Sequence, residues 1–571
     1  MIKKILQFKE KLFFLITKKD IKDIRNVLIL GFVVGLFELI GSALIVLMIQ
    51  VFTNVSLLEE ENILHDIYTH IAAENINYFV SLLAFCIFCF YIVKLILSIY
   101  NAKKMAQITS NLYVDISKKL FENYLNYYYR DFAKKNTAEI NQMLIVESDH
   151  LSLMVSNVIY LIIHLVIIGL LYGYMVYIDW FLTFIVTVFF VCLAYMYKKI
   201  LNNRLVIMGE ERIDAVDSYM RFIKSTFANY KFIKGLDGKY IEDNLSIKTE
   251  NYKSARVDMF FWAETPRLLL EFIVIVMMIG ILVFIKLKYP NTDELLVVVS
   301  AYAIALFRML PSLSRVLNGV NMINMYKKTL DMVHIEFNNK IEDKNMGKNV
   351  KNKINFDDVI KLKNISFQYP DSEDKSLDNL TLSINKGDKI AIVGESGSGK
   401  STLMDILIGL HLPTDGNLSV DSKDINSKNI VKWRTNTSFV PQKVVLFEST
   451  VKENITFGKV YDENLLQEVL KDVFMYDTVM SKGGVESKIG DEISGFSGGQ
   501  MQRIALARAL YQERDIIFLD EATSSLNETI EIEIIENILK KYKEKTIIAI
   551  VHKESIAKKF TKTIKLNQGE I

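Results

Sequence analysis

Long apolar stretches alternate with charged intervals over the first 320 residues of this chain. Each stretch is close to or longer than the roughly 20 residues that an α-helix needs to cross a bilayer. The pattern therefore predicts six membrane-spanning helices in a transmembrane domain over residues 26–325. The expected spans cover residues 26–52, 78–100, 153–178, 180–196, 260–285 and 295–316.

The distribution of charge predicts the orientation of these spans. Residues 1–25 are rich in lysine, whereas no Lys or Arg occurs from Asn26 to Val93. Because basic residues concentrate on the cytoplasmic side, we expect residues 53–77 outside and both termini in the cytoplasm. Residues 1–25 are expected to form an amphipathic helix on the cytoplasmic membrane face, and residues 57–73 a short external helix.

The pattern changes after the last span. Residues 326–357 are polar with little apolar periodicity and are predicted to be a linker. Residues 358–571 alternate short β-rich runs with helical ones, which is typical of an α/β nucleotide-binding domain. The expected fold class is thus an α-helical membrane domain followed by an α/β domain. The apolar fraction of 51% agrees with a membrane protein, and the net charge of +2 gives no reason to expect a nucleic-acid partner.

A glycine-rich loop in the second domain carries the first chemical signal. It follows the apolar run 389–393 and precedes the helical run 402–410. Backbone N–H groups at such a strand–loop–helix junction bind phosphates, while a lysine adds a cation and a serine a hydroxyl for Mg²⁺. We therefore expect a nucleotide triphosphate at Gly394, Glu395, Ser396, Gly397, Ser398, Gly399, Lys400, Ser401 and Thr402.

Two carboxylates end a later apolar run, Ile516 to Leu519. Asp520 is expected to hold Mg²⁺ together with Ser401, and Glu521 to polarise the water that attacks the nucleotide. A buried strand that ends in solvated acids is the alternative. The order of this run after the phosphate loop favours the catalytic interpretation.

The segment before this strand resembles the signature motif and helix of ABC-transporter ATPases. It comprises Phe496, Ser497, Gly498, Gly499 and Gln500, followed by the helical run 502–509. The resemblance implies that this helix start binds the γ-phosphate of ATP held by a second subunit.

Other positions are assigned a role by this resemblance alone. Tyr369 matches the aromatic residue that stacks on adenine, Gln442 the glutamine that reaches Mg²⁺ and the attacking water, and His552 the histidine that holds the γ-phosphate. Phe496 stands where the family usually has Leu, and Asn527 where it usually has Asp. The second departure predicts altered communication between the two ATP sites.

One ATPase domain after six spans is half of an exporter in this family, so the resemblance implies a dimer. A homodimer is the simplest interpretation, with a heterodimer as the alternative. Short coupling helices are expected near 128–134 and 228–234. The implied location is the inner membrane of a bacterium.

Ionisable residues within the spans point to the transported molecule. Lys94, Arg267 and Arg308 would suit an anionic headgroup if they line a cavity, whereas Glu38 and Glu271 would neutralise cations if they pair with them. The surrounding residues resemble PglK-type flippases of lipid-linked oligosaccharides. This resemblance implies movement of a polyprenyl-diphosphate-linked glycan to the outer leaflet. Export of a drug, another lipid or a peptide, and a regulatory role without transport, are the alternatives.

Overall fold

The chain folds into two compact units, which are described separately. The computed structural model describes residues 10–12, 14–53, 68–69, 75–235, 238–288, 292–339, 354–370, 372–489 and 495–571. The helical unit contains Met1–Tyr124 and Lys135–Asn339, and the α/β unit contains Leu125–Lys134 and Lys340–Ile571.

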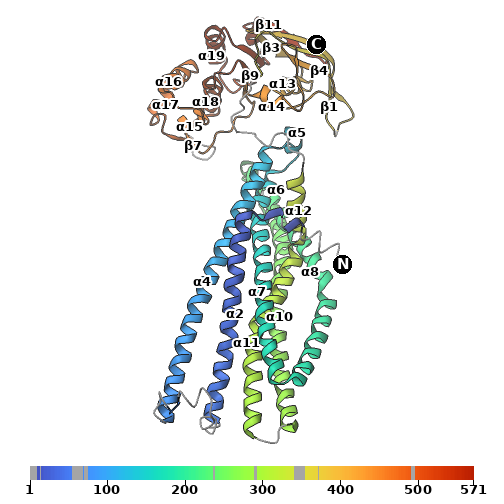
Figure 1. Ribbon diagram of the computed structural model, residues 1–571. Coiled ribbons are helices and arrows are strands. Elements are labelled where there is room, and N and C mark those ends of the chain that lie inside the picture. Colours follow the sequence, from blue (N-terminus) through green and yellow to red (C-terminus); the bar gives the residue numbers. More distant parts are fainter. Residues whose placement is uncertain are drawn as a thin grey trace. The chain divides into compact units, whose positions relative to one another are not determined.

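Long helices dominate the helical unit, and α7 and α11 run side by side in Figure 1. The helices of this unit are α2 (Lys18–Thr53), α4 (Ile76–Leu125), α6 (Thr137–Asn141), the π-helix η2 (Gln142–Glu147), α7 (Ser148–Ile178), α8 (Trp180–Ala228), α9 (Tyr230–Ile233), α10 (Lys239–Lys288), α11 (Thr292–Met325) and α12 (Lys327–Asn338).

Five helices in the described part of the chain are long and apolar enough to cross a membrane. They are Lys18–Phe52, Ile76–Leu125, Thr137–Ile178, Lys239–Phe284 and Val297–Met325. The predicted fourth span lies in α8, whose described apolar portion, Trp180–Val191, is shorter. Asp179 separates α7 from α8 and caps α8, because its Oδ1 accepts hydrogen bonds from the N–H groups of Phe181 and Leu182, each at 3.0 Å.

Two expected boundaries differ from the structure. The first long helix begins at Lys18, so residues 18–25 continue into the first span and do not belong to a separate surface helix. The region expected to be a linker contains α12, in which Leu330 and Val333 are buried. Burial of these two residues, three apart on one helical face, stabilises a helix that is polar in composition. Most of the expected external helix at 57–73 lies outside the described residues.

A buried polar cluster connects three helices of this unit. Glu147, at the end of η2, is fully buried, and its Oε2 accepts hydrogen bonds from Arg212 at 3.0 Å and Thr329 at 2.6 Å. The guanidinium of Arg212 also lies over the ring of Tyr326, at 5.6 Å from its centre. Tyr326 separates α11 from α12. The cluster therefore fixes the joint between a membrane helix and α12.

The described strands of the α/β unit form three sheets. An antiparallel sheet has the order β2-β1-β4-β5, a parallel sheet the order β11-β3-β10-β9-β6, and β7 pairs with β8. The strands are β1 (Val359–Gln368), β2 (Lys375–Asn385), β3 (Lys389–Val393), β4 (Asp415–Val420), β5 (Lys423–Asp424), β6 (Thr437–Val440), β7 (Ser449–Thr450), β8 (Lys488–Ile489), β9 (Ile516–Asp520), β10 (Thr546–Ile550) and β11 (Lys562–Lys565).

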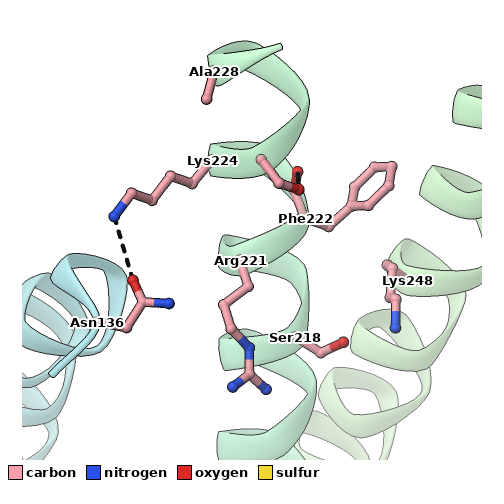
Figure 2. A pocket seen from close by; sticks show the side chains of 8 residues that line it. Asn136, Ser218, Arg221, Phe222, Lys224, Ala228 and Lys248 are labelled. Atoms are coloured by element: carbon pink, nitrogen blue, oxygen red, sulfur yellow. Dashed lines mark hydrogen bonds between the residues drawn. The ribbon is translucent and has the colours of Figure 1, made fainter. Parts of the chain in front are cut away.

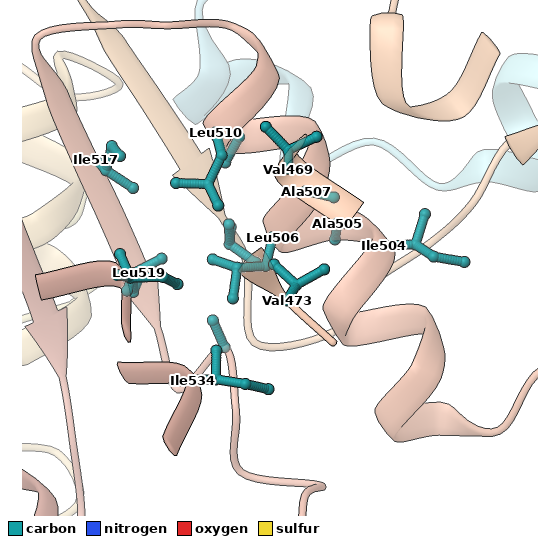
Figure 3. Packing of buried hydrophobic residues seen from close by; sticks show 14 of the residues in the cluster. Val469, Val473, Ile504, Ala505, Leu506, Ala507, Leu510, Ile517, Leu519 and Ile534 are labelled. Atoms are coloured by element: carbon teal, nitrogen blue, oxygen red, sulfur yellow. The ribbon is translucent and has the colours of Figure 1, made fainter. Parts of the chain in front are cut away.

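Helices cover the parallel sheet and bury its apolar strands. Figure 3 shows Leu506 and Leu510 of α18 in one cluster with Ile517 and Leu519 of β9. The helices are α5 (Tyr129–Phe132), α13 (Lys400–Ile408), α14 (Ile430–Arg434), α15 (Val451–Thr456), α16 (Glu463–Asp472), α17 (Tyr476–Ser481), α18 (Gly498–Tyr511), α19 (Glu528–Lys541) and α20 (Glu554–Ala557). Short helices thus occur at both places expected for coupling helices, as α5 in this unit and α9 in the helical unit.

Candidate functional site

The glycine-rich loop connects β3 to α13, as the sequence predicts. Only glycine fits at positions 394 and 399 without a steric clash. An added Cβ would lie 2.3 Å from the carbonyl oxygen of Leu566 at Gly394 and 2.5 Å from that of Ser376 at Gly399. Gly399 also has φ +95°, a left-handed conformation that favours glycine. The ammonium group of Lys400 donates to the carbonyl oxygens of Gly394 at 2.9 Å and Glu395 at 2.6 Å.

This loop has the donor groups that a triphosphate needs. The start of α13 presents backbone N–H groups, and Lys400 supplies a positive charge. Ser398 is 5% exposed, and its hydroxyl oxygen has no hydrogen-bond partner among the described residues. Ser401, exposed at the second position of α13, adds another hydroxyl. The residues from Gly394 to Thr402 therefore fit a nucleotide phosphate chain.

Three residues predicted to act in hydrolysis meet at one edge of the parallel sheet. Gln442, Glu521 and His552 follow the carboxyl ends of β6, β9 and β10, which are neighbours in the sheet. The amide nitrogen of Gln442 donates to Glu521 Oε2 at 2.7 Å. His552 Nε2 forms a very short contact with Oε1 of the same carboxylate. Parallel strand order thus converts three distant sequence positions into one group.

The backbone holds Glu521 in an uncommon conformation. Its φ of +47° lies in the left-handed region, which residues other than glycine rarely adopt. The N–H of Glu521 donates to the carbonyl oxygen of Ile550 at 3.3 Å, which ties the turn to the neighbouring strand β10. Local strain of this kind is concentrated at functional sites, where the surrounding structure fixes a reactive side chain.

Asp520 lies beside these groups at the end of β9. Burial raises the pKa of its carboxyl group, as does the nearby Glu521, whereas Lys400 and His552 act in the opposite direction. No group of three or more His, Cys, Asp or Glu side chains in the described part of the chain is arranged to hold a metal ion. Asp520, Ser401 and Gln442 would hold Mg²⁺ through oxygen atoms, the ligands that this ion prefers.

Tyr369 directly follows β1. Its hydroxyl lies 3.4 Å from Thr402 Oγ1, at the start of α13, and its ring meets that of Phe367 edge-on with 4.9 Å between the centroids. An aromatic ring beside the phosphate loop fits the predicted stacking on a nucleotide base.

The signature segment forms the start of α18. Ser497 is the N-cap residue: its hydroxyl accepts a hydrogen bond from the N–H of Gln500, whose side chain accepts one from the N–H of Ser497 at 2.9 Å. This capping box leaves other N–H groups at the helix start for an anion. Phe496 is buried in the core, as expected for an apolar packing position.

Two residues near this motif have structural roles that the sequence analysis did not assign. Asn527 caps α19, because its side-chain oxygen accepts the N–H of Thr529 at 3.1 Å. Gln502 of α18 accepts hydrogen bonds from the backbone and side chain of Ser525. An Asn that precedes a helical run is a sequence signal for an N-cap, and it could have identified the first role.

Two of the three predicted substrate residues share one carboxylate within the helical unit. Glu38 of α2 forms ion pairs with Lys94 of α4 at 2.6 Å and with Arg308 of α11 at 3.2 Å. The Tyr91 hydroxyl accepts a hydrogen bond from Arg308 at 2.9 Å. Because two cations share one anion, this cluster has a net positive charge. Arg267 is placed differently: its ion pair, with Glu271 at 3.0 Å, lies within α10.

A separate cavity of about 640 Å³ lies between helices of the helical unit. Lys224 of α8 donates a hydrogen bond to Asn136 at 3.3 Å, and Figure 2 shows Lys248 of α10 on the opposite side of α8 from Asn136. Arg221 also lines the cavity and is paired with Asp217 at 2.7 Å. Ala228, at the start of the range expected for a coupling helix, also lines this cavity, whereas none of the predicted ATP-site or substrate residues does.

Comparisons with known proteins agree with this arrangement. Residues 24–307 match the family described as "ABC transporter transmembrane region", and residues 377–524 match "ABC transporter". An "ATP-dependent lipid A-core flippase" of Burkholderia pseudomallei is 25% identical over 481 residues, covering 83% of this chain and 80% of that protein. A flippase of the same description from Bordetella avium is 24% identical over 483 residues, covering 82% and 79%.

A solved structure has the same fold. It is described as "Structure of a bacterial Atm1-family ABC exporter with ATP bound", and the alignment covers 97% of this chain and 94% of that one, with a TM-score of 0.78 and 19% identity. At this level of identity, the likeness establishes the fold alone.

Proposed function

This chain belongs to the ABC transporter family, and on that basis we propose that it is an ATP-driven flippase for an anionic, lipid-linked substrate. The family assignment establishes a multi-pass membrane protein whose ATPase domain binds nucleotide and couples ATP hydrolysis to transport. The substrate class is the proposal. The shared Lys94–Glu38–Arg308 cluster is the observation that carries it.

The chemistry of this cluster favours an anionic headgroup. A charge within a membrane helix is costly unless it is paired or faces a polar cavity. Glu38 compensates part of the charge of Lys94 and Arg308, whose side chains remain 13% and 31% exposed. Arginine and lysine together bind phosphate oxygens well, and a phosphate that approaches would compete with Glu38 for both.

Within this class we propose a polyprenyl-diphosphate-linked oligosaccharide, moved from the inner to the outer leaflet for protein glycosylation or surface glycan synthesis. A diphosphate carries at least two negative charges, which suits the two cations Lys94 and Arg308. Arg267 is proposed as a third residue that contacts the diphosphate. The lipid A-core flippases among the relatives support a lipid substrate, although they do not single out this one. The resemblance to PglK-type flippases remains part of the proposal.

The ATPase mechanism follows from the sheet edge. In the proposed role, Glu521 orients and polarises the attacking water, while Gln442 and His552 hold its carboxylate in place. Mg²⁺, held by Ser401, Asp520 and Gln442, would neutralise charge on the phosphates. The N–H groups at the start of α18, from a second copy of the chain, would close the site. We therefore propose a homodimer in a bacterial inner membrane, with both termini in the cytoplasm.

Reconstitution in proteoliposomes tests the substrate. We expect MgATP to accelerate translocation of a polyprenyl-diphosphate-linked glycan, and Lys94→Gln, Arg308→Gln and Arg267→Gln each to slow it at least tenfold while basal ATPase activity persists. Lys103→Gln is the matched control, because this exposed lysine lies on the same helix as Lys94.

The same assay separates the alternatives. Translocation of the glycolipid at the normal rate by all three variants would overturn the assigned substrate residues. Stimulation by another lipid, a drug or a peptide, with no glycolipid transport, would replace the proposed substrate. ATP hydrolysis without translocation of any of these would favour a regulatory protein.

A further inference from the structure

Four aromatic rings form a continuous series of contacts in the α/β unit. Tyr369 meets the ring of His411 edge-on, with 5.7 Å between centroids, and both rings contact Phe367. His411 also contacts Tyr129 of α5 at 5.6 Å. Tyr129 belongs to the segment 125–134. This segment is part of the α/β unit, but the chain on both sides of it belongs to the helical unit. The rings thus connect the proposed adenine position with this segment.

His411 is held firmly by the helix that starts at the phosphate loop. The N–H groups of Gly409, Leu410 and His411 all donate to the carbonyl oxygen of Asp405 in α13. Gly409 has φ +87°, so it ends the helix in a left-handed cap. The His411 side chain is only 6% exposed. Its ring is therefore packed at the end of α13.

The residues around the end of α13 strengthen this attachment. The indole N–H of Trp433 donates to the carbonyl oxygen of Leu407 at 2.7 Å, and Arg434 donates to that of Gly409 at 2.7 Å. At the other end of α13, Thr402 contacts the hydroxyl of Tyr369 at 3.4 Å. One short helix therefore positions both the phosphate loop and His411 relative to Tyr369.

The contact on the α5 side is less constrained. Tyr129 is 42% exposed, and a cavity of about 300 Å³ lined by Tyr128, Arg130, Asp131 and His411 adjoins it. A segment that is not packed on every side can shift at low cost. The ring of His411 is accordingly the fixed partner in this contact, and Tyr129 is the adjustable one.

We propose that His411 is a positioning residue for ATP binding, which makes adenine stacking on Tyr369 and docking of the segment 125–134 depend on each other. The proposal rests on the proposed function, in which Tyr369 stacks on adenine. Coupling between two sites is reciprocal, so ATP should order the segment and the docked segment should raise ATP affinity by the same factor. Loss of one or two ring contacts corresponds to a factor of roughly two to ten.

Hydrogen exchange of the full-length chain in lipid nanodiscs tests this coupling. All variants carry Glu521→Gln so that bound ATP persists, and MgATP is compared with magnesium tripolyphosphate, which has no base. We expect ATP, but not tripolyphosphate, to slow exchange in the segment 125–134. His411→Leu should abolish this difference and weaken ATP binding roughly two- to tenfold, with tripolyphosphate affinity unchanged.

Two further variants serve as controls. His411→Phe keeps an aromatic ring and should restore both effects. Tyr461→Ala, which removes a tyrosine of similar exposure, 46%, should change neither. If His411→Leu fails to fold, Tyr129→Leu removes the other ring of the same contact. Protection by ATP that survives in His411→Leu, or that is lost equally in His411→Phe, would overturn the coupling.

Tyr369→Ala separates this inference from the proposed function. If this variant still prefers ATP to tripolyphosphate to the normal extent, the adenine role of Tyr369 is wrong. If the preference falls while His411→Leu keeps normal ATP-dependent protection, the adenine site stands and the coupling through His411 is wrong.

Discussion

Glu521 is held from two sides by Gln442 and His552, at a backbone position with φ +47°. Those contacts define where a water molecule can approach its carboxylate. The phosphate loop is formed by a different segment of the chain. Removing the charge of Glu521 should therefore affect ATP hydrolysis more than ATP binding.

We expect Glu521→Gln to lower the rate of ATP hydrolysis by a factor of about 10² to 10⁴, the range typical of a lost general base, while ATP still binds. Steady-state hydrolysis and equilibrium ATP binding, measured on the purified chain, check this. Glu463→Gln, at an exposed glutamate on α16, is the control. Near-normal turnover in Glu521→Gln would refute the assigned role.

Asp405 gives a prediction for pH. Burial and, to a lesser extent, the nearby Asp520 together raise the pKa of its carboxyl group to about 6. The folded protein therefore binds more protons than the unfolded chain between pH 4 and 6, so this group makes stability fall as pH rises through that window. Above about pH 6 the penalty is constant, on the order of 1–3 kcal/mol.

Asp405→Asn should remove this penalty. We expect its melting temperature to exceed that of the unmodified chain at pH 7.5, and the difference to shrink toward pH 5, because protonation relieves the same cost in the unmodified protein. Thermal unfolding of the nucleotide-free chain across this pH range is the measurement. A difference that is independent of pH would contradict the assignment to Asp405.

At the scale of elements, α12 is held by a polar cluster in addition to its buried Leu330 and Val333. Thr329 of α12 bonds to Glu147, and Glu336 of α12 pairs with Lys135 at 2.5 Å. Arg212 of α8 bonds to Glu147 and lies over the ring of Tyr326, at the joint between α11 and α12. Gly209 of α8 permits this approach, because an added Cβ would lie 2.2 Å from the carbonyl oxygen of Met325.

Glu147→Met should therefore destabilise the helical unit strongly. It leaves Arg212 buried without its carboxylate, a cost of about 3–5 kcal/mol. The double variant Glu147→Met, Arg212→Met should recover part of the loss, since apolar side chains of similar volume tolerate burial. Melting temperatures of the two variants are compared with that of Asp217→Asn, which breaks the partly exposed Arg221–Asp217 pair and should change little. If the double variant is less stable than Glu147→Met, the unpaired charge of Arg212 is not the cause of the destabilisation.

At the scale of the whole molecule, the proposed dimer makes each ATP site from two chains. Lys400→Ala disables the phosphate loop and Ser497→Arg the signature helix, so each variant alone should lack ATPase activity. In a mixed dimer one site contains both defects and the other contains none. The isolated mixed dimer should therefore recover activity, up to about half of the normal value, because one of its two sites is intact.

Co-expression of the two variants with different affinity tags, followed by tandem purification, isolates the mixed dimer. Its ATPase activity is compared with that of each variant purified in the same way. If the mixed species is as inactive as its parents, each site is formed within one chain and the composite arrangement is wrong.

The fold class and the phosphate loop could be predicted from the sequence because their signals are local. Apolar runs of membrane length and the spacing of Gly394, Gly399 and Lys400 depend on neighbours in the chain. The α12 helix could not be predicted this way, because its composition is polar and its Thr329 bonds to Glu147 and Arg212, more than 100 residues away.

What only the tertiary structure decided is which distant residues meet. Residue types alone made Glu38 a candidate partner for Lys94 or Arg308, and the packing of α2, α4 and α11 gave it both. Parallel strand order brought Gln442 and His552 to the same carboxylate. The physical reason is the same in both cases: the sequence determines local conformation and chemical type, whereas pairing across the fold depends on how the elements pack.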